Sequence, residues 1–303
     1  MSKENPTNLS ASIRQRLLNL ARQRKDEFQL VLIHYGLERL LYRLSNSAHA
    51  DQFTLKGALL FQIWVGQSHR STLDLDLLGK GASDVERFTE IFREICTVVV
   101  PDDGLTFLPA SVHGEETREE QRYNGIRIHA TAILGKAKIP IQVDIGFGDA
   151  VTPASQTIQY PSLLGLPAPT LKAYPMETVI AEKYEAMVSL GIANSRMKDF
   201  YDLWTLARDY EFDGTILAKA IRSTFKRRAT ALPIKLPVAL TQEFASDRTK
   251  RTQWRAFVAK GKLLIEAPPL SDVIALLQNF LWPVTEAELP TRFAKMWRRG
   301  IWE

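Results

Sequence analysis

The chain has 303 residues, 45% hydrophobic and 24% charged, the composition of an ordinary soluble globular protein with one large domain or two closely packed ones. It contains no apolar run long enough to cross a bilayer and no apolar export signal at its N-terminus, so we expect a cytoplasmic protein without membrane partners. Its single cysteine, Cys96, excludes an internal disulfide framework and a thiolate metal cluster.

The net charge of +5 is unevenly distributed. Residues 221–262 contain eleven Lys and Arg against two acids, a net charge of +9 that leaves −4 for the rest of the chain. Such asymmetry indicates a polyanionic partner for the C-terminal part. A solvated basic face explains the same composition, and both interpretations stay open at this stage.

The first half of the chain alternates helical and strand patterns. Apolar residues at helical spacing, strict two-residue alternation and a capping box at Ser83–Glu86 mark the elements. In chain order we expect helices at 10–23 and 26–45, a strand at 53–55, a helix at 58–65, a strand at 73–78, a helix at 83–99 and strands at 105–112, 124–134 and 139–147.

The second half reads as helical after a proline-rich connector at 148–172, which we expect to wrap the surface. The expected helices are 175–190, 195–210, 214–226, 236–259, 270–280 and 285–298. The sequence therefore predicts an α/β fold in two parts: an α/β domain with an N-terminal helical pair at 1–165 and a helical domain at 166–303.

Three acids interrupt apolar strands. Asp74 and Asp76 stand two apart, so their side chains project from one face with Cα atoms about 6.5–7 Å apart. Two carboxylates at that distance repel each other unless they are solvated or a cation lies between them. Asp144 lies in a neighbouring strand candidate with Gln142 two residues before it. Three carboxylates suit Mg²⁺ at a phosphoryl-transfer centre, and a solvated edge strand is the alternative.

Two short turns are candidate phosphate contacts. Lys56-Gly57 precedes a predicted helix, and Arg70-Ser71-Thr72 precedes the acidic strand. Backbone N–H groups, hydroxyls and cations at such turns hold phosphate oxygens. Both patterns are also common in turns that bind nothing.

A second charged group lies in the helical part. Lys183 falls on a mainly apolar stripe, where an ammonium requires an anion. Arg196, Asp199 and Asp202 follow at three-residue spacing and share a helix face. An intrahelical Arg–Asp ladder and a functional site explain this spacing equally well.

Taken in order, five stretches resemble the AbiEii/AbiGii toxin family, which includes the MenT nucleotidyltransferase toxins of bacterial toxin–antitoxin systems. The stretches are Leu55–Leu60, Arg70–Leu77, Gln142–Asp149, Glu182–Met187 and Ser195–Leu203. They span about half of the chain. Two positions depart from the family's pattern: Ser71-Thr72 replaces a Gly-Ser pair, and Ala58 replaces the second glycine of Lys-Gly-Gly.

The resemblance implies a polymerase-β-like minimal nucleotidyltransferase core with a mixed sheet, and a helical domain that contributes to the active site and to acceptor binding. It implies that Asp74 and Asp76 bind metal, that Thr72 contacts phosphate, and that Lys183 contacts the triphosphate. It also implies that the acid at Asp199 is required. Asp144 matches the third carboxylate of the wider superfamily. We therefore expect these acids to converge beside a pocket that the Lys183 ammonium reaches.

The expected function is Mg²⁺-dependent transfer of a nucleoside monophosphate from an NTP to RNA with release of pyrophosphate. By analogy with the family, the first-choice acceptor is the tRNA 3′ end, whose modification blocks translation, and an antitoxin protein is the expected partner. Candidate acceptor contacts, with Trp254 as a base-stacking residue, are Arg196, Lys226, Arg227, Arg228, Arg251 and Arg255. The alternatives are an enzyme that nucleotidylates (AMPylates) proteins and a non-catalytic nucleotide- or RNA-binding module.

Overall fold

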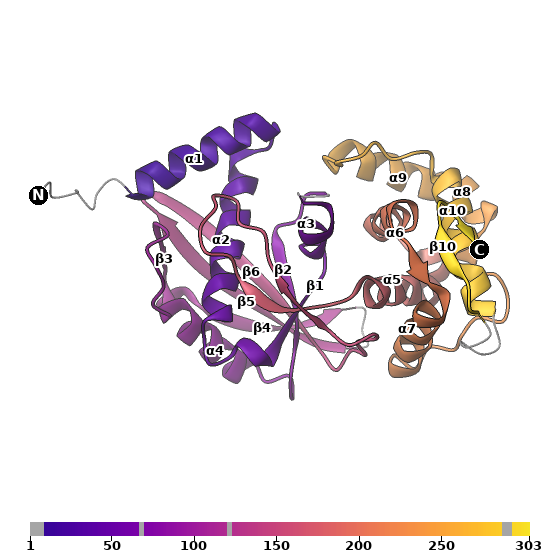
Figure 1. The fold of residues 1–303 in the computed structure, drawn as a ribbon, viewed down its shortest axis with the longest axis horizontal. Coiled ribbons are helices and arrows are strands. Elements are labelled where there is room, and N and C mark those ends of the chain that lie inside the picture. The colour runs from indigo at the N-terminus through magenta and orange to yellow at the C-terminus, as the bar shows by residue number, and fades with distance from the viewer. Residues whose placement is uncertain (1–8, 67–69, 120–122, 287–292) are drawn as a thin grey trace, which may run out of the picture. The chain divides into compact units, whose positions relative to one another are not determined.

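The computed structural model describes residues 9–66, 70–119, 123–286 and 293–303. The chain divides into two compact units: one consists of the chain up to Gly148 and Thr157–Ala173, the other of Asp149–Gln156 and Tyr174–Glu303 (Figure 1). The chain thus passes from one unit to the other three times, and the expected boundary at 165/166 falls inside a segment of the first unit.

The first unit is built on a mixed sheet. Its strands follow the order β3-β5-β6-β2-β1-β8-β7, and β4 also pairs with β5. Strand β2 runs parallel to β6 and antiparallel to β1. The strands are β1 (Phe53–Lys56), β2 (Asp74–Gly79), β3 (Leu105–Phe107), β4 (His113–Glu119), β5 (Tyr123–Leu134), β6 (Ala137–Phe147), β7 (Gln156–Gln159) and β8 (Thr170–Ala173).

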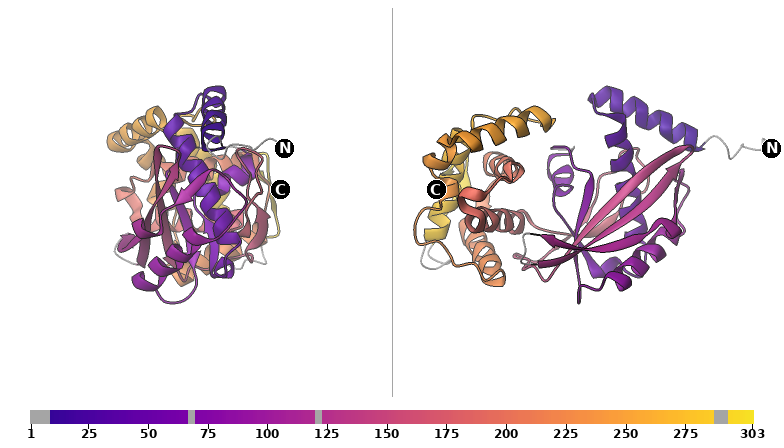
Figure 2. Two further views of the ribbon diagram at one scale, coloured as in Figure 1. Left: turned by 90° about the vertical axis from the view of Figure 1, so that its left-hand side faces the viewer. Right: turned by 180° about the vertical axis from the view of Figure 1, so that it is seen from behind.

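Helices cover one face of this sheet. They include α2 and α4, and the helices of the unit are α1 (Leu9–Arg24), α2 (Phe28–Ser45), α3 (Leu60–Val65) and α4 (Val85–Thr97). A Cβ atom on Gly36 of α2 would lie 2.7 Å from Cδ1 of Ile141, so glycine allows the helix to approach β6 closely. The ring of Phe53 packs edge-on against Phe88 and Phe92 of α4. From behind, β5 and β6 lie in front of α2 (Figure 2), so no helix formed by the described residues of this unit covers their second face.

Side chains alternate across the sheet as the sequence predicts. In β2, Leu75 and Leu77 are fully buried, whereas Asp74 and Asp76 project from the opposite face and are partly exposed. The same alternation places Asp144 of β6 on the face that carries the two acids of β2. The hydrophobic core thus fixes which way the carboxylates point.

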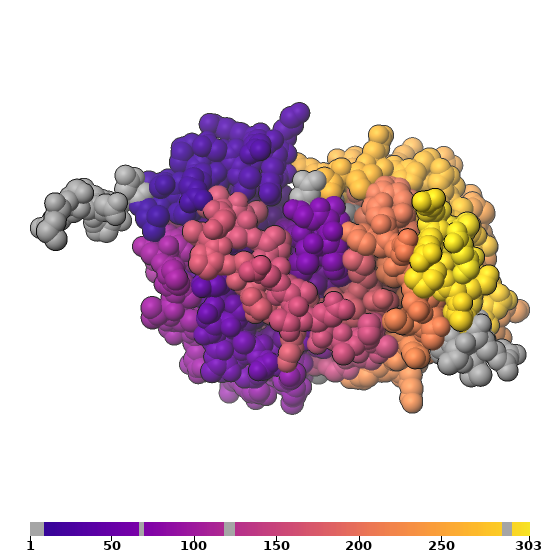
Figure 3. All heavy atoms as spheres, in the orientation of Figure 1, coloured from indigo at the N-terminus to yellow at the C-terminus, as the bar shows by residue number. Residues whose placement is uncertain are grey.

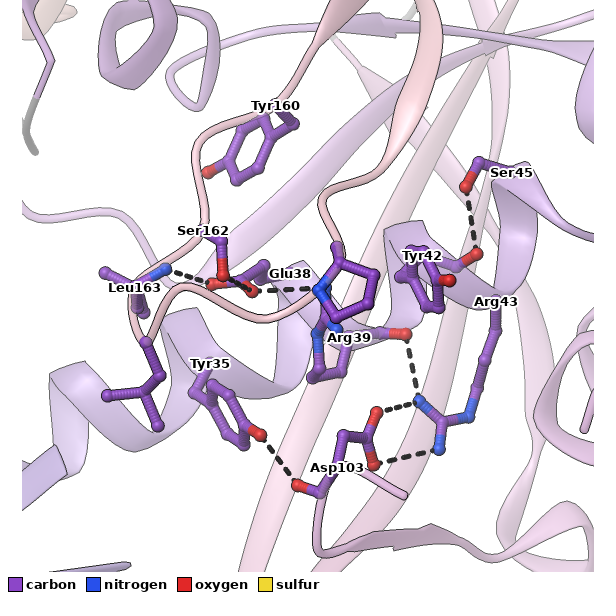
Figure 4. A network of polar contacts seen from close by, with 12 residues as sticks. Tyr35, Glu38, Arg39, Tyr42, Arg43, Ser45, Asp103, Tyr160, Ser162 and Leu163 are labelled. Atoms are coloured by element: carbon purple, nitrogen blue, oxygen red, sulfur yellow. Dashed lines mark hydrogen bonds and ion pairs between the residues drawn. The ribbon is translucent and has the colours of Figure 1, made fainter. Parts of the chain in front are cut away.

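Buried charges on α2 anchor the connector (Figure 4). The Glu38 carboxylate accepts hydrogen bonds from Ser162 Oγ at 3.0 Å and from the Leu163 N–H at 2.8 Å. Arg39 pairs with Glu38 and donates to the Pro167 carbonyl at 2.7 Å. The segment Thr157–Ala173 therefore lies fixed on the surface of the first unit, as the space-filling view shows (Figure 3).

The second unit is mainly helical. Its helices are α5 (Met176–Leu190), α6 (Met197–Asp209), α7 (Gly214–Arg227), α8 (Gln242–Ser246), α9 (Arg248–Lys260) and α10 (Leu270–Glu286). A small sheet with the order β11-β10-β9 accompanies them, made by β9 (Phe212–Asp213), β10 (Met296–Arg298) and β11 (Ile301–Trp302). No helix in the described ranges combines the length and the apolar character needed to span a bilayer.

Two helix predictions in this unit are wrong. The helix expected at 236–259 is broken at Asp247, whose side chain caps α9 by accepting from the Lys250 N–H at 2.9 Å. Of the helix expected at 285–298, the first two residues end α10 and Met296–Arg298 forms β10; residues 287–292 lie outside the described ranges. In the first unit, the strand expected at 105–112 ends early, and a 3₁₀ turn follows at Pro109–Ser111.

Candidate active site

A row of charged side chains crosses the helix-free face of the first unit's sheet. Residues that stand opposite one another in a ladder project from the same face. The row consists of Lys56, Asp76, Asp144 and Arg127, which lie on the adjacent strands β1, β2, β6 and β5. In the strand register, each of these residues stands opposite the next one in the row. Asp74 lies two residues before Asp76 in β2, opposite Gln142 of β6.

Gly57 leaves room for the Asp76 carboxylate. Its φ of +75° is strained for any residue with a Cβ, and a Cβ at this position would overlap the carboxylate of Asp76. The Lys56-Gly57 turn, which the sequence marks as a phosphate contact, therefore also sets the position of a predicted metal ligand.

Thr72 holds Asp74. Its hydroxyl donates to Asp74 Oδ1 at 2.5 Å, and its side chain is buried. Arg70 and Ser71 precede it at partly exposed positions. The hydroxyl predicted to contact phosphate thus orients a carboxylate in this structure, while the two preceding residues lie nearer the surface.

Asp144 is engaged by Arg127, a residue that we did not identify from the sequence. Arg127 donates to both carboxylate oxygens, at 2.7 and 3.0 Å, and Gln142 adds a bond of 3.2 Å. The hydrogen bond to Asp144 raises the pKa of Arg127, so the guanidinium stays charged. The signal that could have revealed this pair is the charged residue between the apolar residues Ile126 and Ile128.

The donor set fits a hard divalent cation. Within the described ranges, no cluster of three or more His, Cys, Asp or Glu is arranged to hold a metal ion. Asp74 and Asp76 supply carboxylate oxygens from one strand face, and oxygen is the ligand that Mg²⁺ prefers. Because Mg²⁺ usually takes one or two protein carboxylates and completes its shell with water and phosphate, two such ligands suffice.

The second unit contains a buried group of charges on α5 and α6. Lys183 Nζ lies 2.6 Å from Asp199 Oδ1 and 2.8 Å from Asp202 Oδ2, and both acids are at most 1% exposed. Arg196 Nε donates to the other Asp199 oxygen at 2.6 Å. Burial alone would raise the pKa of Asp199, but the charges of Lys183 and Arg196 outweigh it and lower that pKa. Two cations thus balance two acids, and Asp202 joins the site that the sequence assigned to Asp199.

Helix α9 supports this group from outside. Lys250 is buried and donates to the backbone carbonyl of Asn194 at 2.8 Å. The side chain of Asn194 in turn accepts from the N–H of Arg196 at 2.8 Å. Lys250, one of the basic residues of 221–262, therefore fixes the turn before α6 rather than facing solvent.

The other candidate acceptor contacts divide into exposed and internal residues. Lys226, Arg227, Arg251 and Arg255 are exposed. By contrast, the Arg228 guanidinium lies 2.9 Å from Glu185 and 3.4 Å from both Glu182 and Asp149, so acids within the fold compensate its charge.

The prediction that Trp254 stacks on a base is wrong. The side chain is 4% exposed, and its Nε1 donates to the Pro268 carbonyl at 3.0 Å. Its ring packs against Phe257 of the same helix. Trp254 is therefore a core residue that attaches α9 to the segment before α10.

One protein family and two solved structures are similar to this chain. The family model described as the nucleotidyl transferase AbiEii toxin of a type IV toxin–antitoxin system matches residues 39–276. A crystal structure assigned as a nucleotidyltransferase from Helicobacter pylori is similar in fold, with a TM-score of 0.50 and 15% identity over 88% of this chain and 98% of that chain. The structure of JHP933 from the same organism gives 0.48 and 15% over 86% and 94%. A search of curated proteins gives no match.

Proposed function

The chain belongs to the AbiEii family of nucleotidyl transferase toxins, and from this premise we propose that it transfers a nucleoside monophosphate from an NTP to RNA and releases pyrophosphate. The proposed acceptor is the 3′ end of tRNA, so that modification stops translation, and the proposed protein partner is a cognate antitoxin. The proposal that the protein is catalytic rests on one observation: Asp74 and Asp76 lie on one face of β2, with Lys56 opposite Asp76.

Asp74 and Asp76 are the proposed Mg²⁺ ligands. Bound there, the ion would neutralise negative charge on the phosphoryl group that is transferred and on the leaving pyrophosphate. Asp144 is the proposed third carboxylate, although its two oxygens now accept from Arg127. In a ligand role, Asp144 would share its remaining lone pairs with the ion while Arg127 holds the carboxylate in place.

The chain's own residues bind and orient the nucleotide in this proposal. Lys56 supplies positive charge beside Asp76, and Arg70 and Ser71 supply donors at the turn before β2. We also propose that Lys183 contacts the triphosphate. Asp199 orients its ammonium through the bond of 2.6 Å, because a buried carboxylate restricts the directions in which an ammonium can donate.

The exposed cations of the second unit are the proposed RNA contacts. Arg251 and Arg255 lie four residues apart on α9, a helix of thirteen residues that contains no acid. Lys226 and Arg227 end α7 and are exposed as well. Basic side chains of this kind neutralise backbone phosphates without reading the base sequence.

The acceptor is tested by incubating the protein with each α-³²P-labelled NTP, protein-free tRNA and Mg²⁺, followed by a denaturing gel that separates RNA from polypeptide. We expect label on RNA, at a position that 3′-exonuclease digestion removes first. Label on polypeptide alone would replace RNA by a protein acceptor. Absence of label from both would reject nucleotidyl transfer to either class.

A further inference from the structure

A chain of buried hydrogen bonds leads from the connector to Asp74. The Tyr160 hydroxyl donates to Gln62 Oε1 at 2.5 Å, and Gln62 Nε2 lies 3.4 Å from His34 Nδ1. His34 Nε2 lies 2.9 Å from the Thr72 carbonyl oxygen. The Thr72 hydroxyl then donates to Asp74 Oδ1. Four segments of the first unit, α2, α3, the entry to β2 and the connector, meet in this chain.

The partners fix the direction of every bond. A carbonyl oxygen only accepts, so His34 Nε2 carries a proton and donates to Thr72. Tyr160 occupies the oxygen of the Gln62 amide, which leaves the amide nitrogen to donate to His34 Nδ1. Nδ1 is therefore an acceptor and the imidazole is neutral. Burial lowers the pKa of His34, in agreement with this neutral form.

These hydrogen bonds hold the entry to β2 in place, because apolar packing contributes little to its position. Leu73, which lies between Thr72 and Asp74 in the sequence, is 57% exposed. Arg70 and Ser71 are partly exposed, whereas Thr72 is 7% exposed. Thr72 is thus the anchored residue of the turn: His34 fixes its backbone, and its own hydroxyl fixes Asp74.

We propose that His34 is a positioning residue for the metal–nucleotide site, acting through Thr72 to hold the Asp74 carboxylate in place. The proposal rests on the function proposed above, since it assigns Asp74 to metal binding. Groups that orient metal ligands in this way typically change metal affinity by about 10- to 100-fold when they are removed. His34, Gln62 and Tyr160 have no assigned role in the family resemblance or in the site described above.

The test compares two substitutions of His34 with metal binding as the readout. His34→Gln places an amide N–H where Nε2 donates, while His34→Leu fills the volume and donates nothing. Mn²⁺ affinity is measured by the electron paramagnetic resonance of the free ion, together with the melting temperature. We expect His34→Leu to weaken Mn²⁺ binding about 10-fold and His34→Gln to stay within about 3-fold of the unsubstituted protein. Asp74→Ala gives the reference for loss of the site.

A core substitution in the same unit provides the matched control. Ile95→Ala in α4 removes a fully buried side chain and lowers stability outside the hydrogen-bonded chain. Equal Mn²⁺ weakening in Ile95→Ala and His34→Leu, or failure of His34→Gln to restore binding, overturns the positioning role. So does an unsubstituted protein that binds no Mn²⁺, or an Asp74→Ala variant that binds it normally. The expected ranking in a protein that transfers no nucleotide supports the positioning role and rejects the proposed reaction.

Discussion

Glycine at position 57 illustrates how one missing Cβ shapes the site. We predict that Gly57→Ala lowers nucleotidyl transfer at least about 10-fold, because its methyl group displaces the Asp76 carboxylate as well as straining the backbone. Gly66→Ala is the matched control, since Gly66 has a similar φ of +79° but no atom of the described residues within 4 Å of where a Cβ would go. Both variants are assayed for transfer and for unfolding in urea. Equal losses of transfer would show that strain alone matters.

The contact between Arg127 and Asp144 leads to a second prediction, which concerns the substitution of Asp144. Because both Asp144 oxygens already accept from this guanidinium, we propose that Asp144 is a weaker metal ligand than Asp74 and expect Asp144→Asn to cost only about 10-fold in transfer. The variant's rate is compared with that of Asp74→Asn under the same metal concentration. Equal, near-complete loss of transfer in both variants would show that Asp144 is as essential a ligand as Asp74.

Strand period was enough to predict that Asp74 and Asp76 share a face, since alternation with Leu75 and Leu77 allows no other arrangement. Their immediate surroundings were not predictable in the same way. Arg127 reaches Asp144 across 17 residues and His34 reaches Thr72 across 38. Such contacts depend on strand register and helix placement, which periodicity within one segment does not contain.

At the scale of elements, the buried charges between α5 and α6 hold two helices together. We predict that Asp202→Ala lowers the free energy of unfolding by about 3 kcal/mol, because it removes one of the two buried acids that compensate the mostly buried Lys183 ammonium. Asp209→Ala on the same helix is the control: its pair with Arg208 is about one-third exposed, so its loss should cost about 1 kcal/mol or less. Chemical denaturation measures both, and equal costs would contradict the buried role.

Helix α9 carries two kinds of basic residue: Arg251 and Arg255 face solvent, whereas Lys250 is buried and supports the fold. We expect Arg251→Glu with Arg255→Glu to weaken tRNA binding and to reduce the salt dependence by about 1 per lost phosphate contact. Lys136→Glu, at an exposed position of the hairpin between β5 and β6, is the control. Filter binding across a salt series measures the slopes. Unchanged slopes in the α9 variant would identify its basic side chains as merely solvated.

Hydrophobic spacing predicted the long helices α1, α2, α5, α6 and α7 within a few residues. It failed for the C-terminal segment because that structure depends on distant contacts. Trp297 of β10 is fully buried and donates to the Ala207 carbonyl at the end of α6, and β10 pairs with β9, more than eighty residues earlier. A helical pattern there was overruled by tertiary packing.

At the scale of the molecule, the α/β fold class and the family predicted from five ordered motifs are confirmed. The connector behaved differently from a plain linker: it contributes β8 to the sheet of the first unit, and Asp149 to the acids that surround Arg228 in the second. The predicted metal ligands belong to the first unit, and Lys183 and Asp199 belong to the second.

We infer that nucleotide transfer by the folded protein depends on the paired carboxylates of β2. This dependence is tested most directly by the rate of label transfer from α-³²P NTP to tRNA for the unsubstituted chain, Asp74→Asn and Asp76→Asn, with Asp209→Asn as a folded control. We predict that either β2 substitution lowers the rate by about 1,000-fold or more while the melting temperature and the Asp209→Asn rate stay near those of the unsubstituted protein. Transfer that persists in Asp74→Asn and Asp76→Asn would rule out a catalytic role for this pair.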